Sequence, residues 1–169
     1  MIFIDMDGTV AKMFQKENYL EKMYEKDFFA RLKPYGWVKD LNKLAEIRDD
    51  IYILSACVNT DYCEKEKAYW LRTHLPNIPV NHYIFTKVGE NKAEKVDEMF
   101  GEKAGYKILI DDYSQNLYDW EMQDQNYIGI KYLNEINNKS KKHYKYTIKN
   151  LGDLNQILTK LGEVARVER

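Results

Sequence analysis

Residues 1–10 read MIFIDMDGTV, an apolar run that leads directly into two acids. Its three apolar residues, 2–4, are typical of a buried strand, and Asp5 and Asp7 follow at once. Side chains two residues apart on an extended segment point in the same general direction, and Gly8 lets the chain turn sharply behind them. The stretch therefore predicts a first strand that delivers two carboxylates to one place, although such a pair alone does not define a function.

The composition is that of an ordinary globular protein. The chain has 169 residues, of which 44% are hydrophobic and 31% charged, and its formal net charge is -1. These values are typical of one soluble domain, and a charge so close to zero gives no general attraction to nucleic acid or to an anionic membrane. We expect no stable nucleic-acid partner. Because no apolar run reaches the ~18 residues of a membrane helix and the first residues lack a secretory pattern, we expect a cytoplasmic protein.

The two cysteines, Cys57 and Cys63, are expected to be free thiols, as is usual in a reducing cytosol. Without a second pair they do not support a zinc site. We interpret Cys57 as a packing residue and Trp70 as a core residue.

Short apolar runs alternate with helical patterns along the chain. Strands are expected at 2–4, 51–54, 83–85, 107–110 and 127–130, and helices at 36–47, 60–75, 92–100, 114–122 and 151–161. Between the first strand and the first of these helices, residues 11–33 are polar and helix-prone up to Pro34. This alternation predicts an α/β fold, with a parallel sheet of about five strands and helices on both of its faces.

Polar side chains follow several of the expected strands. Ligands bind at the carboxyl ends of the strands in such sheets. The polar residues near these ends should therefore meet in space; they are Asp5, Asp7, Thr9, Ser55, Ala56, Lys92, Asp111 and Asp112. Four carboxylates at one edge of a sheet repel one another. A hard cation such as Mg²⁺, which prefers oxygen ligands, relieves that repulsion.

A phosphate group would complete the ligand shell of such a cation. Ser55 can donate a hydrogen bond to it, together with backbone N–H groups at the start of the next helix, and Lys92 can neutralise another oxygen. One acid of the opening pair can then attack phosphorus and form an aspartyl-phosphate. The other acid can protonate the leaving oxygen and later activate water.

These motifs, in this order, resemble those of the haloacid dehalogenase (HAD) superfamily of phosphatases, which have a Rossmann-like fold. The first motif, a strand followed by DxDGT, is matched by residues 5–9, and the second, a Ser or Thr that ends a strand, by Ser55. The fourth, an acidic pair after a strand, is matched by 111–112. The third is a lysine, for which Lys92 fits best because it opens a helix between strands, while Lys87 and Lys95 remain alternatives.

The resemblance implies a role for each matching residue. Asp5 would be the nucleophile and Asp7 the general acid/base. The Asp5 side chain, the Asp7 backbone carbonyl and Asp111 would hold Mg²⁺. Phosphate would be bound by Ser55, Ala56 and Lys92, and supporting roles would fall to Thr9, Asp112 and Asn116. Asp112 would support the metal waters or the lysine, and Asn116 could hold the phosphate loop or simply cap its own helix.

A closer resemblance, over roughly residues 1–133, is to the 5′(3′)-deoxyribonucleotidases. It is carried by DFFARLKPYGWVKDLNKL (27–44), ILSA (53–56), YCEKEKAYWLRTHLP (62–76) and KILIDDYSQNLYDWE (107–121). It implies an enzyme that removes phosphate from nucleoside monophosphates, preferably deoxy forms.

That family carries a substantial helical cap after its first motif. Here residues 11–34 leave room for a reduced cap of one or two short helices, inserted into a core of residues 1–10 and 35–169. Phe14, just past the first motif, is the candidate substrate contact. Most of the other aromatic residues of the cap are expected to pack it against the core, with stacking on a nucleobase as the alternative; they are Tyr19, Tyr24, Phe28 and Phe29.

Other functions remain open at this point. The same chemistry would serve a sugar phosphate or a nucleic-acid 3′-phosphate. A receiver-like domain would bind Mg²⁺ and phosphate without being an enzyme, but its acidic pair would follow the first strand, whereas here the pair follows the fourth. Residues 134–146 are interpreted as a solvated loop, with a flap over the site or a weak nucleic-acid contact as alternatives, and residues 163–169 as a frayed end. Whether the protein forms a homodimer is also left open.

Overall fold

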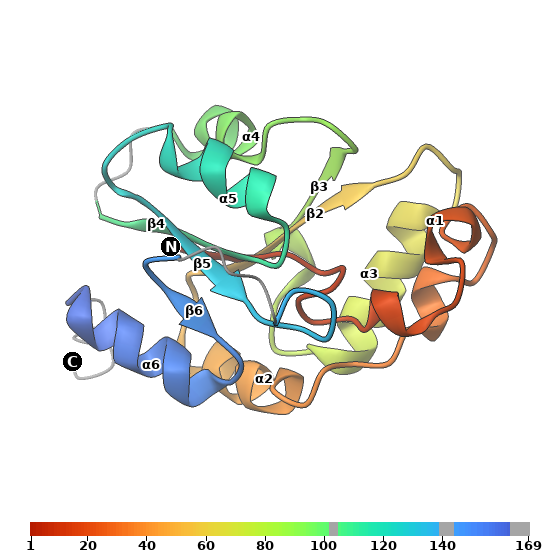
Figure 1. Cartoon of the computed structure of the whole chain (residues 1–169), viewed down its shortest axis with the longest axis horizontal. Coiled ribbons are helices and arrows are strands. Elements are labelled where there is room, and N and C mark those ends of the chain that lie inside the picture. The colour runs from red at the N-terminus through yellow and green to blue at the C-terminus, as the bar shows by residue number, and fades with distance from the viewer. Residues whose placement is uncertain (102–104, 139–143, 163–169) are drawn as a thin grey trace.

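The computed structural model describes residues 1–101, 105–138 and 144–162. In this part of the chain six strands form one sheet in the order β3-β2-β1-β4-β5-β6 (Figure 1). All neighbouring strands are parallel. The strands are β1 (Ile2–Ile4), β2 (Ile51–Cys57), β3 (Tyr83–Lys87), β4 (Lys107–Asp111), β5 (Tyr127–Tyr132) and β6 (Thr147–Ile148). The predicted α/β class and parallel sheet are confirmed, with six strands rather than about five.

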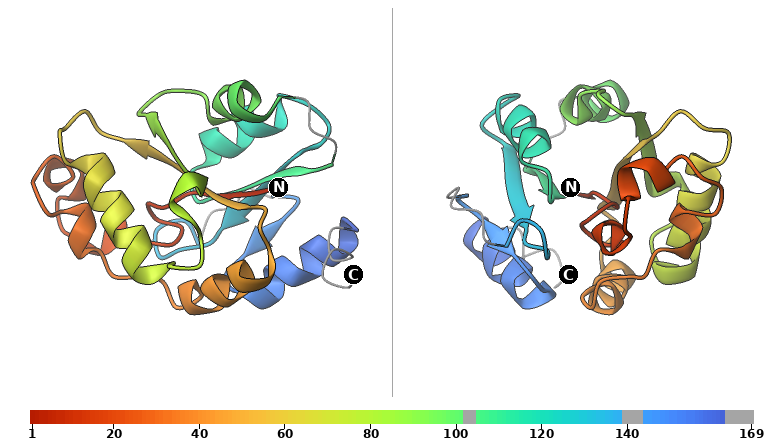
Figure 2. Two further views of the ribbon diagram at one scale, coloured as in Figure 1. Left: turned by 180° about the vertical axis from the view of Figure 1, so that it is seen from behind. Right: turned by 45° about the vertical axis from the view of Figure 1, so that its right-hand side comes forward.

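Helices cover both faces of this sheet (Figures 1 and 2). On one face lie α2 (Val38–Ile47), α3 (Cys63–His74) and α6 (Leu151–Lys160), and on the other α4 (Lys92–Phe100) and α5 (Ser114–Glu121). The remaining helices are short: α1 (Tyr19–Lys22) and the 3₁₀ turns η1 (Met13–Gln15), η2 (Phe29–Arg31) and η3 (Val80–His82). The helix boundaries agree with the predicted ranges to within three residues.

The sheet is buried on both faces, as a parallel sheet requires. In β1, Ile2 and Ile4 pack into the core beneath α2 and α3. Phe3 points to the opposite core, where its ring packs edge-on against Trp120 at 5.4 Å. This double burial is why the strand appears in the sequence as a continuous apolar run rather than as an alternating pattern.

The chain order places the ends of β1 and β4 at the point where the sheet changes direction. From β1 the chain proceeds outward to β2 and β3, and then crosses to β4 on the other side of β1. Ile4 pairs with Ile110, and the Asp5 N–H donates to the Ile110 carbonyl at 2.9 Å. The residues that follow the two strands therefore meet at a topological switch point, where α/β sheets bind ligands.

Residues 11–34 form a compact insertion that is closed at its base by a bridge between Ala11 and Pro34. It contains η1, α1 and η2, so its one α-helix has only four residues. Figure 2 shows it beside α3. The Glu66 carboxylate of α3 accepts hydrogen bonds from the N–H groups of Asp27 at 2.5 Å and Phe29 at 3.1 Å, which fastens the insertion to the core.

One sequence interpretation is wrong in part. Asn134 belongs to the stretch that we interpreted as a solvated loop, yet it is only 4% exposed. The chain turns over residues 134–138, and the side chain of Asn134 is held by hydrogen bonds to Gly8 and Asp112 of the core. Residues 139–143 of that stretch, and 163–169 at the end, lie outside the described residues.

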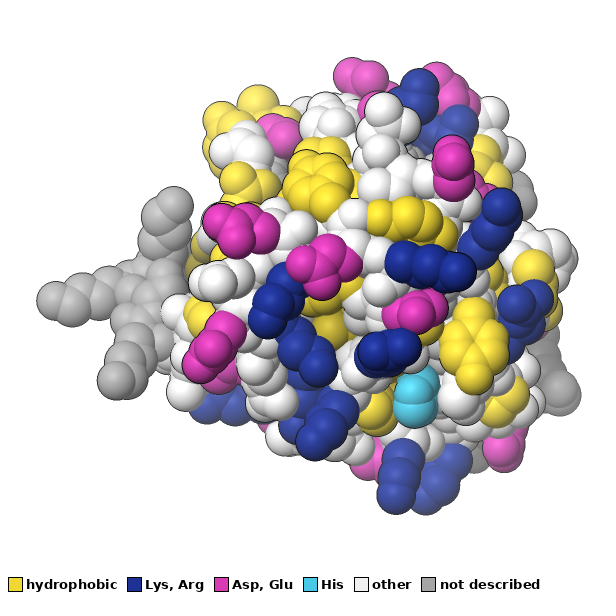
Figure 3. All heavy atoms as spheres, turned by 90° about the vertical axis from the view of Figure 1, so that its right-hand side faces the viewer, with side chains coloured by type: hydrophobic (Ala, Val, Ile, Leu, Met, Phe, Trp, Pro, Cys, Tyr) yellow, Lys and Arg dark blue, Asp and Glu magenta, His cyan; other side chains and the backbone are white. Residues whose placement is uncertain are grey.

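No helix in the described ranges combines the length and apolarity needed to cross a membrane. On the face that carries α1 and α3, acidic and basic side chains are interspersed (Figure 3).

Candidate active site

A buried lysine lies between two acids at the ends of β1 and β4. The Lys92 ammonium is 2.7 Å from Asp5 Oδ1 and 2.7 Å from Asp111 Oδ2. All three side chains are buried. Lys92 reaches this position because it is the first residue of α4, whose start is capped by the Asn91 side chain accepting from the N–H of Ala93 at 2.8 Å.

The two alternative lysines point elsewhere. The Lys95 ammonium pairs with Glu98 at 3.1 Å, and Lys87 is exposed and donates its backbone N–H to Glu90. Of the three candidates, Lys92 is the one whose ammonium contacts the acids.

Burial and neighbouring charges shift the pKa values of the acids and the lysine in this cluster. Burial, opposed by Lys92 and reinforced by Asp111, raises the pKa of Asp5 to about 7. Burial also raises the pKa of Asp112 to about 8, and the Asp111 carboxylate adds to this rise. Burial alone would lower the pKa of Lys92, but Asp111 and Asp5 outweigh it and raise this pKa above its ordinary value. Asp5 and Asp112 therefore hold their protons to a higher pH than ordinary carboxyls do, because one ammonium does not offset three buried carboxylates.

Two asparagines hold the acidic pair in place. Asn116 Nδ2 donates to Asp111 Oδ2 at 2.8 Å, a contact that neither sequence alternative for Asn116 included. Asn134 Nδ2 donates to Asp112 Oδ2 at 2.8 Å and to the Gly8 carbonyl at 2.9 Å. Asn134 thereby ties the acidic pair of β4 to the turn after β1. Sequence reasoning missed Asn134, since it lies 126 residues from Gly8.

Asp7, the second acid of the opening stretch, forms an ion pair with a different lysine, Lys67. The Lys67 ammonium lies 2.5 Å from Asp7 Oδ2, 3.0 Å from Ser55 Oγ and 2.5 Å from the Ala56 carbonyl. Its side chain is fully buried, with the ammonium 4.6 Å from the centre of the Phe29 ring.

Lys67 was also missed by the sequence analysis, although a signal was present. On α3 it shares a buried face with Cys63, Trp70 and Leu71, at the spacing of successive helical turns. A lysine on an apolar helix face must reach a partner, because an unpaired buried charge is costly.

Two of the phosphate-binding candidates, Ser55 and Ala56, lie within β2 rather than after it. The strand continues to Cys57 because its pairing with β3 extends that far, from Ser55 opposite Phe85 to Cys57 opposite Lys87. Ser55 is fully buried, and its hydroxyl oxygen accepts from Lys67. Thr9 is also buried; its carbonyl accepts from Trp37 Nε1 at 2.9 Å, while its hydroxyl has no hydrogen-bond partner among the described residues.

A cavity of about 440 Å³ opens over these acids. The same cavity is also lined by Phe14, Tyr19, Tyr113 and Ile136. The Phe14 and Tyr19 rings pack edge to face at 5.1 Å. Of the other aromatic residues of the insertion, Phe28 and Phe29 are buried in the core, as expected for packing residues, whereas Tyr24 is exposed.

Gly8 is required by the close packing beneath this cavity. A Cβ atom at Gly8 would lie 2.4 Å from the Phe14 ring and 2.6 Å from Asp112 Oδ2. The residue also has φ +77°, which an L side chain rarely adopts. The turn after Asp7 therefore admits no side chain.

Residues 9–160 match the model of the family described as 5′ nucleotidase, deoxy (Pyrimidine), cytosolic type C protein, or NT5C. The chain belongs to this family. It is accordingly a phosphatase of the HAD type, as the motifs of residues 5–9, 55 and 111–112 indicate. A comparison with curated proteins gives no match.

Solved structures share the HAD fold with this NT5C-family chain. A phosphoserine phosphohydrolase-like protein from Francisella tularensis subsp. tularensis SCHU S4 superposes with a TM-score of 0.64 at 17% identity, covering 93% of this chain and 98% of the other. The HAD domain of the effector protein Lem4 from Legionella pneumophila, an inactive mutant, gives 0.50 at 16% identity, covering 97% and 94%. At such low identity these likenesses describe the fold alone.

The donor set of this NT5C-family site fits a divalent cation. Carboxylate oxygens of Asp5, Asp111 and Asp112 all lie within 4.8 Å of one another. Asp7 adds a buried oxygen, Oδ1, for which the described part of the chain offers no hydrogen-bond partner. Hard cations prefer such clusters of carboxylate oxygens, so this acidic triad could bind a metal ion.

Proposed function

We propose that this phosphatase removes the phosphate from nucleoside monophosphates through an aspartyl-phosphate on Asp5, with Mg²⁺ as its cofactor. The observation that carries the proposal is the separate pairing of the two acids: Asp5 contacts Lys92, whereas Asp7 contacts Lys67. Two acids in different surroundings suit different roles in one reaction. The match to the NT5C family supports a nucleotide as substrate and a cytoplasmic location.

In the first half of the reaction, Asp5 is the nucleophile. Lys92 holds Oδ1 of Asp5, and we assign the attack on phosphorus to the second oxygen. As the new bond to phosphorus forms, the ester bond breaks, and Asp7 supplies a proton to the leaving oxygen from its Oδ1. Lys67 holds the other oxygen of Asp7 and so keeps this acid oriented.

In the second half, Asp7 takes a proton from the water that hydrolyses the aspartyl-phosphate. Asp5 is released as a carboxylate and inorganic phosphate leaves. Asp7 thus acts as a general acid in the first half of the reaction and as a general base in the second.

The remaining residues would bind metal and phosphate. We assign Mg²⁺ to the Asp5 and Asp111 side chains and the Asp7 carbonyl; when bound, this cation supplies charge neutralisation for the phosphate oxygens. Ser55, Ala56 and Lys92 are the phosphate-binding residues in this proposal. The supporting residues are Thr9, Asp112 and Asn116. Ser55 already accepts from Lys67, which leaves its own proton free to donate to a phosphate oxygen.

The cavity supports a nucleoside on the other side of the phosphate. We assign residues 11–34 as the reduced cap and residues 1–10 and 35–169 as the core. Phe14 is the proposed base-stacking residue, since its ring lines the cavity beside the acids. The exposed Tyr113 and Ile136 of the core also line this cavity.

The test is the release of inorganic phosphate from a panel of substrates with Mg²⁺ present. The panel contains deoxy- and ribonucleoside monophosphates, sugar phosphates and 3′-phosphorylated oligonucleotides. The fastest turnover is expected on deoxynucleoside monophosphates and should be abolished by EDTA.

Equal rates on the whole panel would contradict the nucleotidase assignment. If a sugar phosphate or an oligonucleotide 3′-phosphate is hydrolysed fastest, that compound would replace the nucleotide as the assigned substrate of the same reaction. Release from none of them would favour a receiver-like domain. A rate insensitive to EDTA would contradict the metal.

A further inference from the structure

The turn after β5 places an apolar side chain in the wall of the active-site cavity. The turn covers residues 134–138, and Ile136 at its centre lines the cavity together with Asp5 and Asp112. Ile136 belongs to the core and not to the insertion, and it is 59% exposed. A ligand in the cavity can therefore cover it.

Local hydrogen bonds fix the backbone of this turn. Asn134 Oδ1 accepts from the N–H groups of Ile136 at 3.1 Å and Asn137 at 3.2 Å. The N–H of Asn134 donates to Asn137 Oδ1 at 2.9 Å, and that of Asn138 donates to the Asn134 carbonyl at 3.0 Å. The turn itself therefore sets the direction in which the Ile136 side chain leaves the backbone.

The turn is anchored at the glycine against which Phe14 packs. Asn134 Nδ2 donates to the Gly8 carbonyl at 2.9 Å. A Cβ at Gly8 would lie 2.4 Å from the Phe14 ring. The turn that carries Ile136 and the insertion that carries Phe14 therefore meet at Gly8, and both side chains line the same cavity.

A second hydrogen bond ties the turn to the base of the insertion. The Tyr35 hydroxyl donates to Glu135 Oε2 at 2.7 Å. Tyr35 directly follows Pro34, which pairs with Ala11 where the insertion closes. The turn is thus held by the core and by the base of the insertion, so the wall that it forms is in place before a substrate binds.

The side-chain amides of the cavity already have partners. Asn116 Nδ2 donates to Asp111 Oδ2 at 2.8 Å, and Asn137 Nδ2 donates to two backbone carbonyls at 3.0 and 3.2 Å. Ser114 Oγ accepts from the Lys131 ammonium at 3.0 Å. Among the described residues of the wall, the apolar and aromatic side chains are therefore the ones left to contact a base; they are Phe14, Tyr19, Tyr113 and Ile136.

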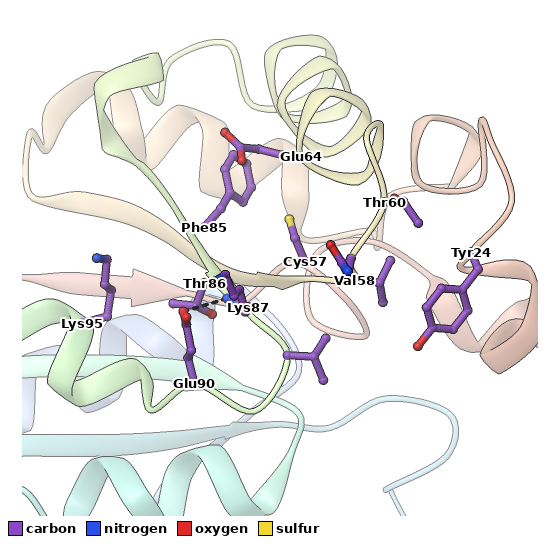
Figure 4. Close-up of a pocket in the computed structure, with 12 residues that line it drawn as sticks. Tyr24, Cys57, Val58, Thr60, Glu64, Phe85, Thr86, Lys87, Glu90 and Lys95 are labelled. Atoms are coloured by element: carbon purple, nitrogen blue, oxygen red, sulfur yellow. Dashed lines mark hydrogen bonds between the residues drawn. The ribbon is translucent and has the colours of Figure 1, made fainter.

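A second cavity, of about 730 Å³, begins at the next residue of β2 and has a different character (Figure 4). Ala56 lines the first cavity and Cys57 the second. Asp5 and the other acids of the site are absent from the described lining of the second cavity, which instead contains Glu64 and Glu90. Carboxylates accept hydrogen bonds from the N–H groups of bases. A nucleoside whose phosphate lies at Asp5 is therefore expected in the first cavity, and one held in the second would be selected by its base.

We propose that Ile136 contacts the nucleoside and, together with Phe14, holds the base by apolar contact, so that purine and pyrimidine nucleotides are both accepted. This contact rests on the proposed function, whose substrate class it specifies. Every base has a face that can stack or pack in this way. An apolar pocket discriminates weakly, whereas a site that hydrogen-bonds its substrate rejects an analogue without the bonding group by about 10⁴-fold or more. Since the insertion has one α-helix of four residues, the core supplies this wall.

The test measures binding without turnover. The probes are thymidine and deoxyguanosine 5′-methylenephosphonates, in which a CH₂ group replaces the ester oxygen, so that the reaction cannot release phosphate from them. Calorimetry with Mg²⁺ present should give two Kd values within about tenfold of each other. Ile136→Ala should raise both Kd values by roughly tenfold, as expected when apolar contact with a bound ligand is lost. The Kd of methylphosphonate, which has no nucleoside, should stay the same.

Met122→Ala is the matched control. It removes another exposed apolar side chain of the core that does not line the cavity, and it should leave all three Kd values unchanged. Unaltered binding of both nucleoside probes to Ile136→Ala would overturn the inference. A wild-type preference of a hundredfold or more for one base would also overturn it and would direct the nucleoside to the cavity of Glu64 and Glu90.

Phosphate release from the substrate panel judges the proposed function separately. A protein that binds both probes through Ile136 but releases no phosphate from nucleoside monophosphates would contradict the proposed function and leave this contact standing. Binding of neither probe would overturn the contact, whatever the panel shows.

Discussion

Lys67 of α3 and Asp7 of the turn after β1 form a buried ion pair, with 2.5 Å between Nζ and Oδ2. The residues are 60 positions apart, and the lysine side chain is completely buried while that of Asp7 is 21% exposed. Burial alone would lower the pKa of Lys67, but the Asp7 carboxylate, together with the two cysteines and Asp5, outweighs it and raises this pKa. The ammonium therefore stays charged and fixes one oxygen of Asp7, leaving the other free.

Lys67→Met should lower kcat by about a hundredfold, because Asp7 loses its orientation and a 1 Å misplacement can cost that much. Removing one partner of this pair should also cost up to about 3 kcal/mol of stability, since Asp7 retains some solvent. Turnover and thermal unfolding measure the two effects. Lys95→Met, at the exposed pair with Glu98, is the control and should change stability by less than about 0.5 kcal/mol. An unchanged kcat in Lys67→Met would remove Lys67 from the mechanism.

Asp5→Asn should abolish turnover of a generic aryl phosphate, because an amide cannot form the acyl-phosphate bond. Asp7→Asn should lower turnover by roughly two to four orders of magnitude, the usual scale for a lost acid/base group. Asp7→Asn should keep the rise in melting temperature that Mg²⁺ causes, since only the backbone of Asp7 is assigned to the metal. Turnover that survives in Asp5→Asn would refute the nucleophile assignment.

The stabilisation by Mg²⁺ should grow with pH. In the metal-free protein the pKa of Asp5 is raised from 3.8 to about 7 and that of Asp112 from 3.8 to about 8. The folded state thus binds more protons than the unfolded state across this range, and these two acids reduce stability as the pH rises through it. Mg²⁺ takes the place of those protons. Thermal unfolding with Mg²⁺ and with EDTA should show a larger difference at about pH 9 than at about pH 6; a difference independent of pH would contradict this linkage.

Gly8→Ala should both destabilise and inactivate the protein. The added Cβ would meet the Phe14 ring and Asp112 Oδ2, and the positive φ alone costs about 1–3 kcal/mol. Gly36→Ala is the matched control, because a Cβ at Gly36 meets nothing within 4 Å. Gly8→Ala should have a lower melting temperature and a lower turnover than Gly36→Ala. Equal values in the two variants would mean that the turn after Asp7 can rearrange to hold a side chain.

Phe14→Ala should raise KM for deoxynucleoside monophosphates by roughly tenfold, as expected for the loss of one base-stacking ring. KM for a small ester without a base, such as glycerol phosphate, should be unchanged. Tyr118→Ala, which removes an exposed ring outside the active-site cavity, should leave both values as they are. An equal rise for both substrates would assign Phe14 to packing rather than to substrate binding.

Local patterns account for most of the fold. The strands β1 and β4 were predictable because each is a continuous apolar run followed directly by acids. The strand β6 was not, since its two residues, Thr147 and Ile148, are too few to show a period. The end of β2 was placed too early because pairing with β3, which no local pattern reveals, carries the strand through Ser55 to Cys57.

Apolar periodicity and short motifs are local properties, so the parallel sheet, the order of the HAD motifs and the identity of the acids can be predicted from the amino-acid sequence. Which polar side chains meet depends instead on the packing of segments that are distant in the chain. Lys67 reaches Asp7 across 60 residues and Asn134 reaches Gly8 across 126, contacts that depend on how α3 and the turn after β5 pack onto the sheet. Those contacts exist because buried polar groups must find partners, and the partner is chosen by the fold rather than by distance along the chain.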